Sequence, residues 1–159
     1  MIKLNEAIYL SEELNTRMKS LGLKKWYVAY YCEIGESNLA ECIRGERLPN
    51  PWQLILMAEV FGCTVNDLLG HRYFRKEDKP APKSICMGKQ RLAEEMWDRI
   101  RLEIERQNLN IDELADSIYV KKLTFLDWLK PGNTSYPKTI TLLGICRFLN
   151  CTPSDLLGY

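Results

Sequence analysis

The chain of 159 residues lacks most of the features on which metal and redox sites depend. It has a single histidine, His71, and none of its six cysteines belongs to a C-x-x-C pair. Because structural zinc sites need four cysteine or histidine ligands at short spacings, we expect no bound metal. We interpret the cysteines as small buried hydrophobic residues in a reducing compartment, with Cys86 as the one exposed thiol.

Membrane and catalytic signals are also missing. No stretch approaches the ~20 consecutive apolar residues that cross a bilayer, and the first residues lack the basic and apolar regions of a signal peptide. There are no paired carboxylates beside a lone acid–base group and no glycine loop that would cradle a phosphate. We therefore expect a cytoplasmic protein that is not an enzyme, has no cofactor and makes no membrane contact.

The chain has little net charge, only +1, although most nucleic-acid-binding proteins are basic. Residues 1–72 carry −1, residues 73–91 carry +4 and residues 92–159 carry −2. Only the stretch from Arg72 to Lys83 therefore has the footprint that phosphate neutralisation needs. This stretch is polar and contains prolines, which is typical of a linker. Two alternatives stay open: a linker surrounded by solvent, and a linker that lies on DNA phosphates.

What the sequence does contain is a repeat. The pattern C-T-x-x-D-L-L-G at residues 63–70 recurs at residues 151–158, 88 positions later. Upstream, apolar positions coincide at an offset of 86, in the pairs Leu14 and Ile100, Met18 and Ile104, Leu23 and Leu109, Ala29 and Ala115, Ile34 and Val120, and Leu39 and Phe125. Shared apolar positions indicate a shared core. We predict two domains, residues 1–72 and 89–159, joined by a linker of residues 73–88.

Hydrophobic spacing predicts helices throughout and no strand. In the first domain we expect a first helix capped by Ser11. We expect a second helix that begins at Lys24 or Lys25 and ends at a break formed by Glu33-Ile34-Gly35. A third helix over 36–44, a fourth from Pro51 and a short fifth over 66–69 should follow. In the second domain we expect helices over 89–107, 111–118, 122–130, 138–149 and 153–157. The segment 4–10 either extends the first helix or packs as an arm.

The order of these elements and their residues resembles one family. The first copy contains G-L-K-K-x-x-V-A from Gly22, I-G-x-S-x-L from Ile34, R-G-x-x-x-P from Arg44, L-x-x-x-A from Leu54 and F-G-C-T-V-x-D-L-L from Phe61. Over residues 12–70 this resembles the lambda-repressor-like helix-turn-helix family, also called XRE. The second copy is similar but looser, because the loop after its third helix is two residues longer.

The resemblance implies an all-α protein with two five-helix helix-turn-helix domains in tandem. It also implies a transcriptional regulator that binds double-stranded DNA sequence-specifically, and we expect a bacterial or phage repressor. In this family the third helix enters the major groove and the start of the second approaches phosphates. The positions so implicated are Lys25, Glu36, Ser37, Asn38 and Arg44 in the first copy, and Lys121, Lys122, Thr124 and Lys130 in the second. Because the two third helices differ, we predict two unlike half-sites, unless two chains pair as a homodimer.

Some residues at these positions oppose DNA binding. Glu36 and Glu41 would bring negative charge to phosphates, and Leu123 and Leu126 would bring apolar surface to the groove. These residues favour the alternative of a protein-interaction module, such as an antirepressor or a host-takeover factor, on the same scaffold. Aromatic residues also crowd both copies; they are Trp26, Tyr27, Tyr30, Tyr31, Trp97, Tyr119, Trp128 and Tyr136. We interpret them as packed in the core or between the copies, with an external partner as the alternative.

Overall fold

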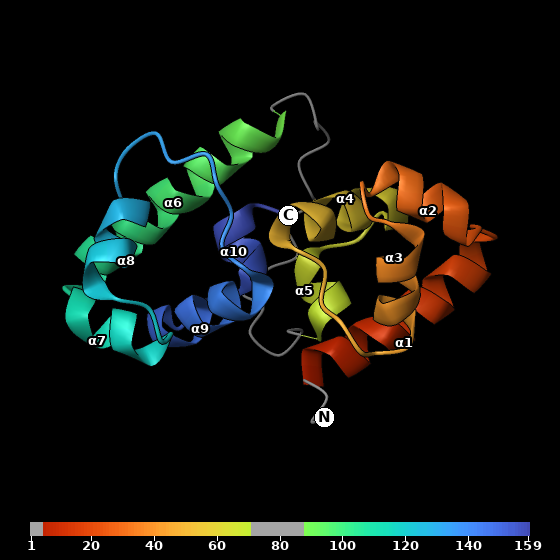
Figure 1. Cartoon of the computed structure of the whole chain (residues 1–159), viewed down its shortest axis with the longest axis horizontal. Coiled ribbons are helices and arrows are strands. Elements are labelled where there is room, and N and C mark those ends of the chain that lie inside the picture. The colour runs from red at the N-terminus through yellow and green to blue at the C-terminus, as the bar shows by residue number, and fades with distance from the viewer. Residues whose placement is uncertain (1–4, 71–87) are drawn as a thin grey trace. The chain divides into compact units, whose positions relative to one another are not determined.

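The computed structural model describes residues 5–70 and 88–159, and every regular element in these residues is an α-helix (Figure 1). The chain forms two compact units. Unit 1 contains α1 (Asn5–Leu21), α2 (Lys25–Tyr31), α3 (Glu36–Ile43), α4 (Pro51–Phe61) and α5 (Val65–Leu69). Unit 2 contains α6 (Gly88–Gln107), α7 (Ile111–Ser117), α8 (Lys122–Trp128), α9 (Thr139–Leu149) and α10 (Pro153–Leu157). The all-helical fold class is confirmed, whereas His71, Cys86 and the basic stretch from Arg72 to Lys83 lie outside the described residues.

The repeated C-T-x-x-D-L-L-G pattern builds the same short helix twice. In α5 the Thr64 hydroxyl accepts from the backbone N–H of Asp67 at 3.1 Å, and the Asp67 carboxylate accepts from the N–H of Thr64 at 3.0 Å. Thr152 and Asp155 do the same in α10, at 3.2 and 2.8 Å. This capping box satisfies two backbone donors at the helix start. The glycine that closes each pattern has a φ of 78° or 77°, which glycine adopts without steric cost.

Most of the apolar positions that align at the offset of 86 are buried in both units, whereas Leu23, Leu109 and Val120 are half-buried. Leu14 and Leu39 are fully buried, and so are their counterparts Ile100 and Phe125. In unit 1, α1 packs against α3, α4 and α5, and α2 packs against α3 and α4. In unit 2, α10 packs against α6 and α9, and α7 packs against α8 and α9. Burying each large apolar side chain contributes about 1.5–3 kcal/mol, so the repeat records the residues that hold each bundle together.

The cysteines behave as small hydrophobic residues. Cys32, Cys42, Cys63 and Cys146 are buried thiols outside any disulfide, and their burial was predicted from the sequence, whereas Cys151 is half-buried. Burial raises the pKa of Cys32 to about 12 and that of Cys42 to about 11. Both side chains therefore stay protonated at neutral pH, and a neutral thiol packs like a small apolar group.

The prediction that Ser11 caps the first helix is wrong. Helix α1 begins at Asn5, so residues 5–10 extend the helix, and Ser11 lies inside it. Ala7 and Leu10 are buried on the same side as Leu14, and this continuous apolar stripe carries the helix past the serine. The Ser11 hydroxyl instead donates to the carbonyl of Ile43 at the end of α3, at 2.5 Å.

Candidate nucleic-acid interface

The second and third helices of each unit are joined by turns of the same length and hydrogen bonding. Four residues separate α2 from α3, and four separate α7 from α8. The N–H of Ile34 donates to the carbonyl of Ala29 at 3.0 Å, and the N–H of Val120 donates to that of Ala115 at the same distance. In both units, therefore, the second and third helices are joined by a turn of the same length with the same backbone hydrogen bond.

Each turn contains one non-glycine residue in the left-handed region. Glu33 has a φ of 51° and Tyr119, its counterpart, a φ of 57°. The sequence placed the break at Glu33-Ile34-Gly35, but Gly35 has a φ of −63° and serves as the N-cap of α3. Glu33 is held in this conformation because its carboxylate accepts from the Trp52 indole N–H at 2.7 Å. The Tyr119 side chain, by contrast, is 98% exposed. The left-handed turn thus has a side-chain support in unit 1 that the exposed ring of Tyr119 does not provide in unit 2.

The C-terminal end of each third helix is tethered from the first helix. Asn15 Nδ2 donates to the carbonyl of Ile43 at 3.4 Å, and Arg101 Nη1 donates to the carbonyl of Leu129 at 2.6 Å. Asn15 and Arg101 are counterparts at the offset of 86. These bonds fix the third helix from its inner side and occupy carbonyls that the helix itself leaves unsatisfied. The residues on its outer side stay available for contacts.

The position of Ser11 is taken by Trp97 in unit 2, and this changes the packing of the third helix. In unit 1 the small serine allows a close approach, since a side chain at Gly45 would lie 3.5 Å from the Ser11 Cβ. In unit 2 the Trp97 ring lies 5.8 Å from the Trp128 ring of α8, and its indole N–H donates to the carbonyl of Ser135 at 2.7 Å. The loop after α8, which contains the two additional residues, thus includes the segment around Ser135 that covers the Trp97 side chain.

The first turn of α8 presents a basic, exposed surface. Lys121, Lys122 and Thr124 are all exposed, so the structure brings these three predicted site residues together. Lys122 Nζ lies 3.1 Å from a carboxylate oxygen of Asp112 in α7, whereas the Lys121 ammonium makes no hydrogen bond or ion pair within the described part of the chain. Leu123 stands between Lys122 and Thr124, and 79% of its surface is exposed. This turn combines charge, a hydroxyl and an apolar side chain.

The other end of α8 carries little free charge. Lys130 Nζ lies 2.7 Å from the Asp127 carboxylate, and this hydrogen bond raises the pKa of Lys130 above its usual value. The lysine stays charged, but the adjacent carboxylate balances it. The sequence placed Lys130 near the end of the third helix, and the structure has it there, just past Leu129, in a local ion pair with Asp127.

The outer side of α3 has a different electrostatic character. Glu36 and Ser37 are exposed at its start, while Asn38 and Glu41 are half-buried and share one partner. Arg47, in the loop after the helix, donates to Asn38 Oδ1 at 3.1 Å and to the Glu41 carboxylate at 2.9 Å. Arg47 therefore balances Glu41 and occupies the amide oxygen that would face an adenine. Sequence reasoning missed Arg47, because its relation to α3 depends on the path of the loop.

The remaining predicted contacts of unit 1 are dispersed. Lys25 is exposed at the start of α2. Arg44 Nε lies 3.1 Å from the Glu46 carboxylate, with both side chains about half exposed. Exposed pairs of this kind contribute only about 0–1 kcal/mol, so an approaching phosphate can compete for the arginine. Unit 1 thus has basic residues at the expected places, and the charge of Arg44 is balanced by an adjacent acid.

Several of the aromatic residues that were interpreted as packed do not lie in the core of their own unit. Trp26, Tyr30 and Tyr31 on α2 are 60%, 76% and 51% exposed, and Tyr119 is exposed as well, whereas Trp97 is buried. The reason is geometric: α2 has seven residues, and Val28 and Ala29 face the core, so the residues on either side of this pair point outward. The rings instead contact one another, with Tyr30 and Tyr31 centroids 5.4 Å apart.

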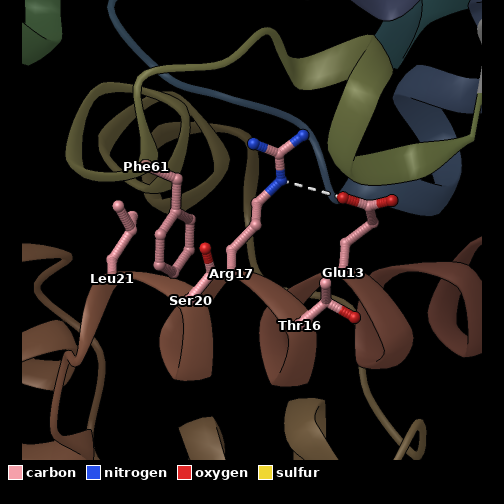
Figure 2. A pocket seen from close by; sticks show the side chains of 6 residues that line it. All are labelled: Glu13, Thr16, Arg17, Ser20, Leu21 and Phe61. Carbon is pink, nitrogen blue, oxygen red and sulfur yellow. Dashed lines mark hydrogen bonds and ion pairs between the residues drawn. The ribbon is translucent and has the colours of Figure 1, made fainter.

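A separate hollow on unit 1 lies away from α2 and α3. Figure 2 shows that α1 supplies most of its lining, with Phe61 from the end of α4. Within it Arg17 Nε donates to the Glu13 carboxylate at 2.8 Å. Burial lowers the pKa of Arg17, but this hydrogen bond and nearby negative charge more than offset burial, so the pKa is raised overall. Since the two charges balance, the hollow adds nothing to a basic surface.

The segment that contains α7 and α8 also carries a recognisable family signature. Residues 99–159 match the family model of the Cro/C1-type HTH DNA-binding domain. The XRE-type resemblance is therefore confirmed for unit 2, which is the copy whose sequence looked the looser of the two. No curated protein and no solved structure gives a significant match to the chain.

The described residues contain neither a membrane-spanning helix nor a cluster of metal ligands. Among helices of residues 5–70 and 88–159, none combines the length and apolar character that crossing a bilayer requires. Within the same residues, no three His, Cys, Asp or Glu side chains gather in a way that would hold a metal ion. The basic first turn of α8 is consequently the feature of the described chain that best matches the chemistry of a nucleic-acid site.

Proposed function

We propose that this chain is a sequence-specific transcriptional regulator that binds double-stranded DNA, with α8 of unit 2 as its principal recognition helix. The observation that carries the proposal is the exposed, basic start of α8 in a segment that matches a DNA-binding family. Helix-turn-helix proteins contact base edges with the N-terminal residues of this helix. The proposal includes repression as the regulatory effect and a bacterial or phage origin.

The residues at the start of α8 have complementary uses in a major groove. Lys121 would hold a phosphate, since no described residue neutralises it, and Lys122 would do so by leaving Asp112. Thr124 has a hydroxyl that serves as donor or acceptor to base edges. The exposed Leu123 would contact a thymine methyl group. Together these contacts would supply both positioning and sequence preference.

We also propose that unit 1 is a second helix-turn-helix domain, with domain limits at residues 1–72 and 89–159. It has the same helix order, the same turn hydrogen bond and the same tether on its third helix as unit 2. If both units contact DNA, the operator consists of two unlike half-sites, because Ser37 and Asn38 have other chemistry than Leu123 and Thr124. Unit 1 would add less affinity, since acids accompany its basic residues.

The test is binding of the full chain to fluorescein-labelled random-sequence duplex DNA, followed by anisotropy at increasing salt. Each phosphate contact contributes about −0.9 to the slope of log K against log salt, so three to five contacts would give a slope of roughly −3 to −4.5. Selection from a random duplex pool, followed by sequencing, should then enrich one motif. A flat salt response together with no enriched motif would overturn the proposal.

The protein-interaction module is a second candidate function, favoured by one specific observation. The α2–α3 surface of unit 1 exposes Trp26 and Tyr30 beside the acidic Glu36, and solvent-exposed apolar surface rimmed by charge is typical of protein interfaces. This function requires neither DNA affinity nor a salt-sensitive response. The anisotropy experiment therefore separates it from the regulator.

A further inference from the structure

Unit 1 contains an open notch on its helix-turn-helix surface. Its volume is about 440 Å³, and it is lined by Trp26, Ala29, Tyr30, Ile34 and Glu36, which we call the aromatic notch. Ala29 and Ile34 are buried and form its floor, while Trp26 and Tyr30, one helical turn apart on α2, rise as exposed walls. Glu36 lies at its edge, in the first turn of α3.

The chemistry of the aromatic notch suits a cationic, partly apolar side chain. The faces of tryptophan and tyrosine attract a lysine or arginine cation, by about 0.5–1 kcal/mol at exposed sites. The Glu36 carboxylate adds a direct ionic partner, and no described residue forms an ion pair with it. By the same chemistry the notch repels a phosphate, so DNA is a poor occupant.

The equivalent place in unit 2 has none of these properties. At the offset of 86, Asp112 and Asp116 replace the two aromatic walls and Lys122 replaces Glu36. Asp112 and Lys122 form an ion pair there, 3.1 Å apart. The notch is therefore a feature of unit 1 alone and does not follow from the shared fold.

Unit 2 presents the complementary surface. Tyr119, Lys121 and Leu123 lie within five consecutive residues that span the turn before α8 and the start of α8, and all three are exposed; we call them the turn knob. Tyr119 and Leu123 are among the most exposed large apolar side chains of the described residues. The knob is basic and apolar, where the notch is acidic and aromatic.

We propose that the aromatic notch of one chain receives the turn knob of a second copy, so that chains associate head to tail. Lys121 would lie against Glu36 and the aromatic walls, while Leu123 and Tyr119 would cover the buried floor. Because notch and knob are unlike surfaces, the contact is heterologous, and it generates either a closed ring or an open chain of copies. The patch is small, so we expect weak association with a Kd on the order of 10–100 μM.

This contact would regulate the proposed DNA-binding site, since the knob contains Lys121 and Leu123 of the α8 start. A chain docked on its neighbour would have this surface covered, and a chain on DNA would be unable to dock. That consequence rests on the proposed function, whereas head-to-tail association itself does not.

The experiment is sedimentation-velocity ultracentrifugation of the full chain from about 1 to 300 μM, a range that brackets the expected Kd. The weight-average mass should rise with concentration at low salt. Two variants remove one surface each: Trp26→Ser with Tyr30→Ser empties the notch, and Tyr119→Ser with Leu123→Ser trims the knob. All four side chains are exposed, so the fold should survive, and circular dichroism checks this.

Mixing the variants decides between docking geometries. Each variant alone should stay monomeric, but an equimolar mixture should form a dimer, because one partner retains an intact notch and the other an intact knob. If the notch variant alone still associates, or the knob variant alone does, the contact is symmetric and the proposal is overturned. Wild-type chains that stay monomeric at the highest concentration overturn it as well.

A charge exchange tests the ionic part, independently of the apolar substitutions. Glu36→Lys and Lys121→Glu should each weaken association several-fold alone, and a mixture of the two should recover it. Failure of the mixture to exceed either variant would remove Lys121 as the occupant. If the notch variant instead loses DNA affinity as strongly as the knob variant, the notch is a DNA contact and this inference falls while the proposed function stands.

Discussion

The two units share a backbone plan but differ in what their third helices present. In unit 2 the start of α8 carries Lys121 and Lys122, whereas at the corresponding end of α3 unit 1 carries Gly35 and Glu36. The fully buried core positions, the capping box of the last helix and the turn between the second and third helices are nevertheless of the same kind. One helical scaffold therefore tolerates opposite surface charge, because charged residues on the outer side of a helix contribute little to its packing.

The largest expected effect comes from truncating the core residue at the centre of each third helix. Phe125→Ala and Leu39→Ala remove equivalent, fully buried side chains. Such changes cost about 3–5 and 2–5 kcal/mol, enough to unfold a small unit. Urea denaturation followed by circular dichroism measures both.

The same pair of variants separates the roles of the units. We expect Phe125→Ala to abolish DNA binding and Leu39→Ala to leave most of it intact, since the second variant spares unit 2. Equal losses of DNA affinity would show that both units are needed for binding. Retained affinity in Phe125→Ala would assign DNA binding to unit 1.

The next effect concerns the charge of the two surfaces. Lys121→Glu with Lys122→Glu should lower DNA affinity at low salt by at least about 100-fold and reduce the salt slope by about 2. The matched control is Lys24→Glu with Lys25→Glu at the start of α2, which changes the net charge equally. Because acids balance Arg44 and Arg47 in unit 1, we expect this unit to contribute less to binding, and the control to lose less than 10-fold. Anisotropy measures both, and an equal or reversed ranking would contradict the asymmetry.

A smaller effect is expected at the two capping boxes. Thr64→Ala removes the hydroxyl that accepts from the backbone N–H of Asp67, and Thr152→Ala removes the one that accepts from the N–H of Asp155, each at the start of a five-residue helix. Loss of such a cap costs about 1 kcal/mol. Thermal unfolding should show similar decreases for both variants, and Thr→Ser at the same positions is the control that keeps the hydroxyl. A loss confined to one unit would mean that the repeated pattern stabilises only that copy.

The smallest effect is a gain in stability from the left-handed turn. Tyr119→Gly should stabilise unit 2 by about 0.5–1 kcal/mol, because glycine adopts positive φ without strain and the exposed ring loses no packing. Glu33→Gly relieves the same strain but removes the acceptor of the Trp52 indole N–H, so we expect no gain. Urea midpoints compare the two, and destabilisation by Tyr119→Gly would reveal a contact of that ring.

Much of the fold could be predicted from local patterns, and the misses have a common cause. Helix boundaries and the buried face of α6 depend on neighbours within one or two turns, and these predictions were close. Ser11 has the chemistry of a cap but lies within an apolar stripe that extends the helix, so its hydroxyl found a partner on α3. The outward position of Trp26 and Tyr30 depends on how much of α2 the core can cover.

The candidate site was predicted in outline only. Lys121, Lys122 and Thr124 come together because they occupy a single helical turn, which sequence spacing specifies. The pairing of Lys130 with Asp127 and the position of Arg47 across α3 depend on side-chain directions and on the path of a loop. In both ion pairs the two charges balance, although a count of charged residues in the sequence would treat them as free surface charges.

By itself the sequence determined that the chain contains two similar helical cores, since apolar periodicity and capping chemistry act between residues close along the chain. The tertiary structure decided which charges are balanced, which aromatic rings stay outside and where the backbone adopts a left-handed turn. Those outcomes depend on groups far apart in sequence, whose distances exist only once the helices have packed.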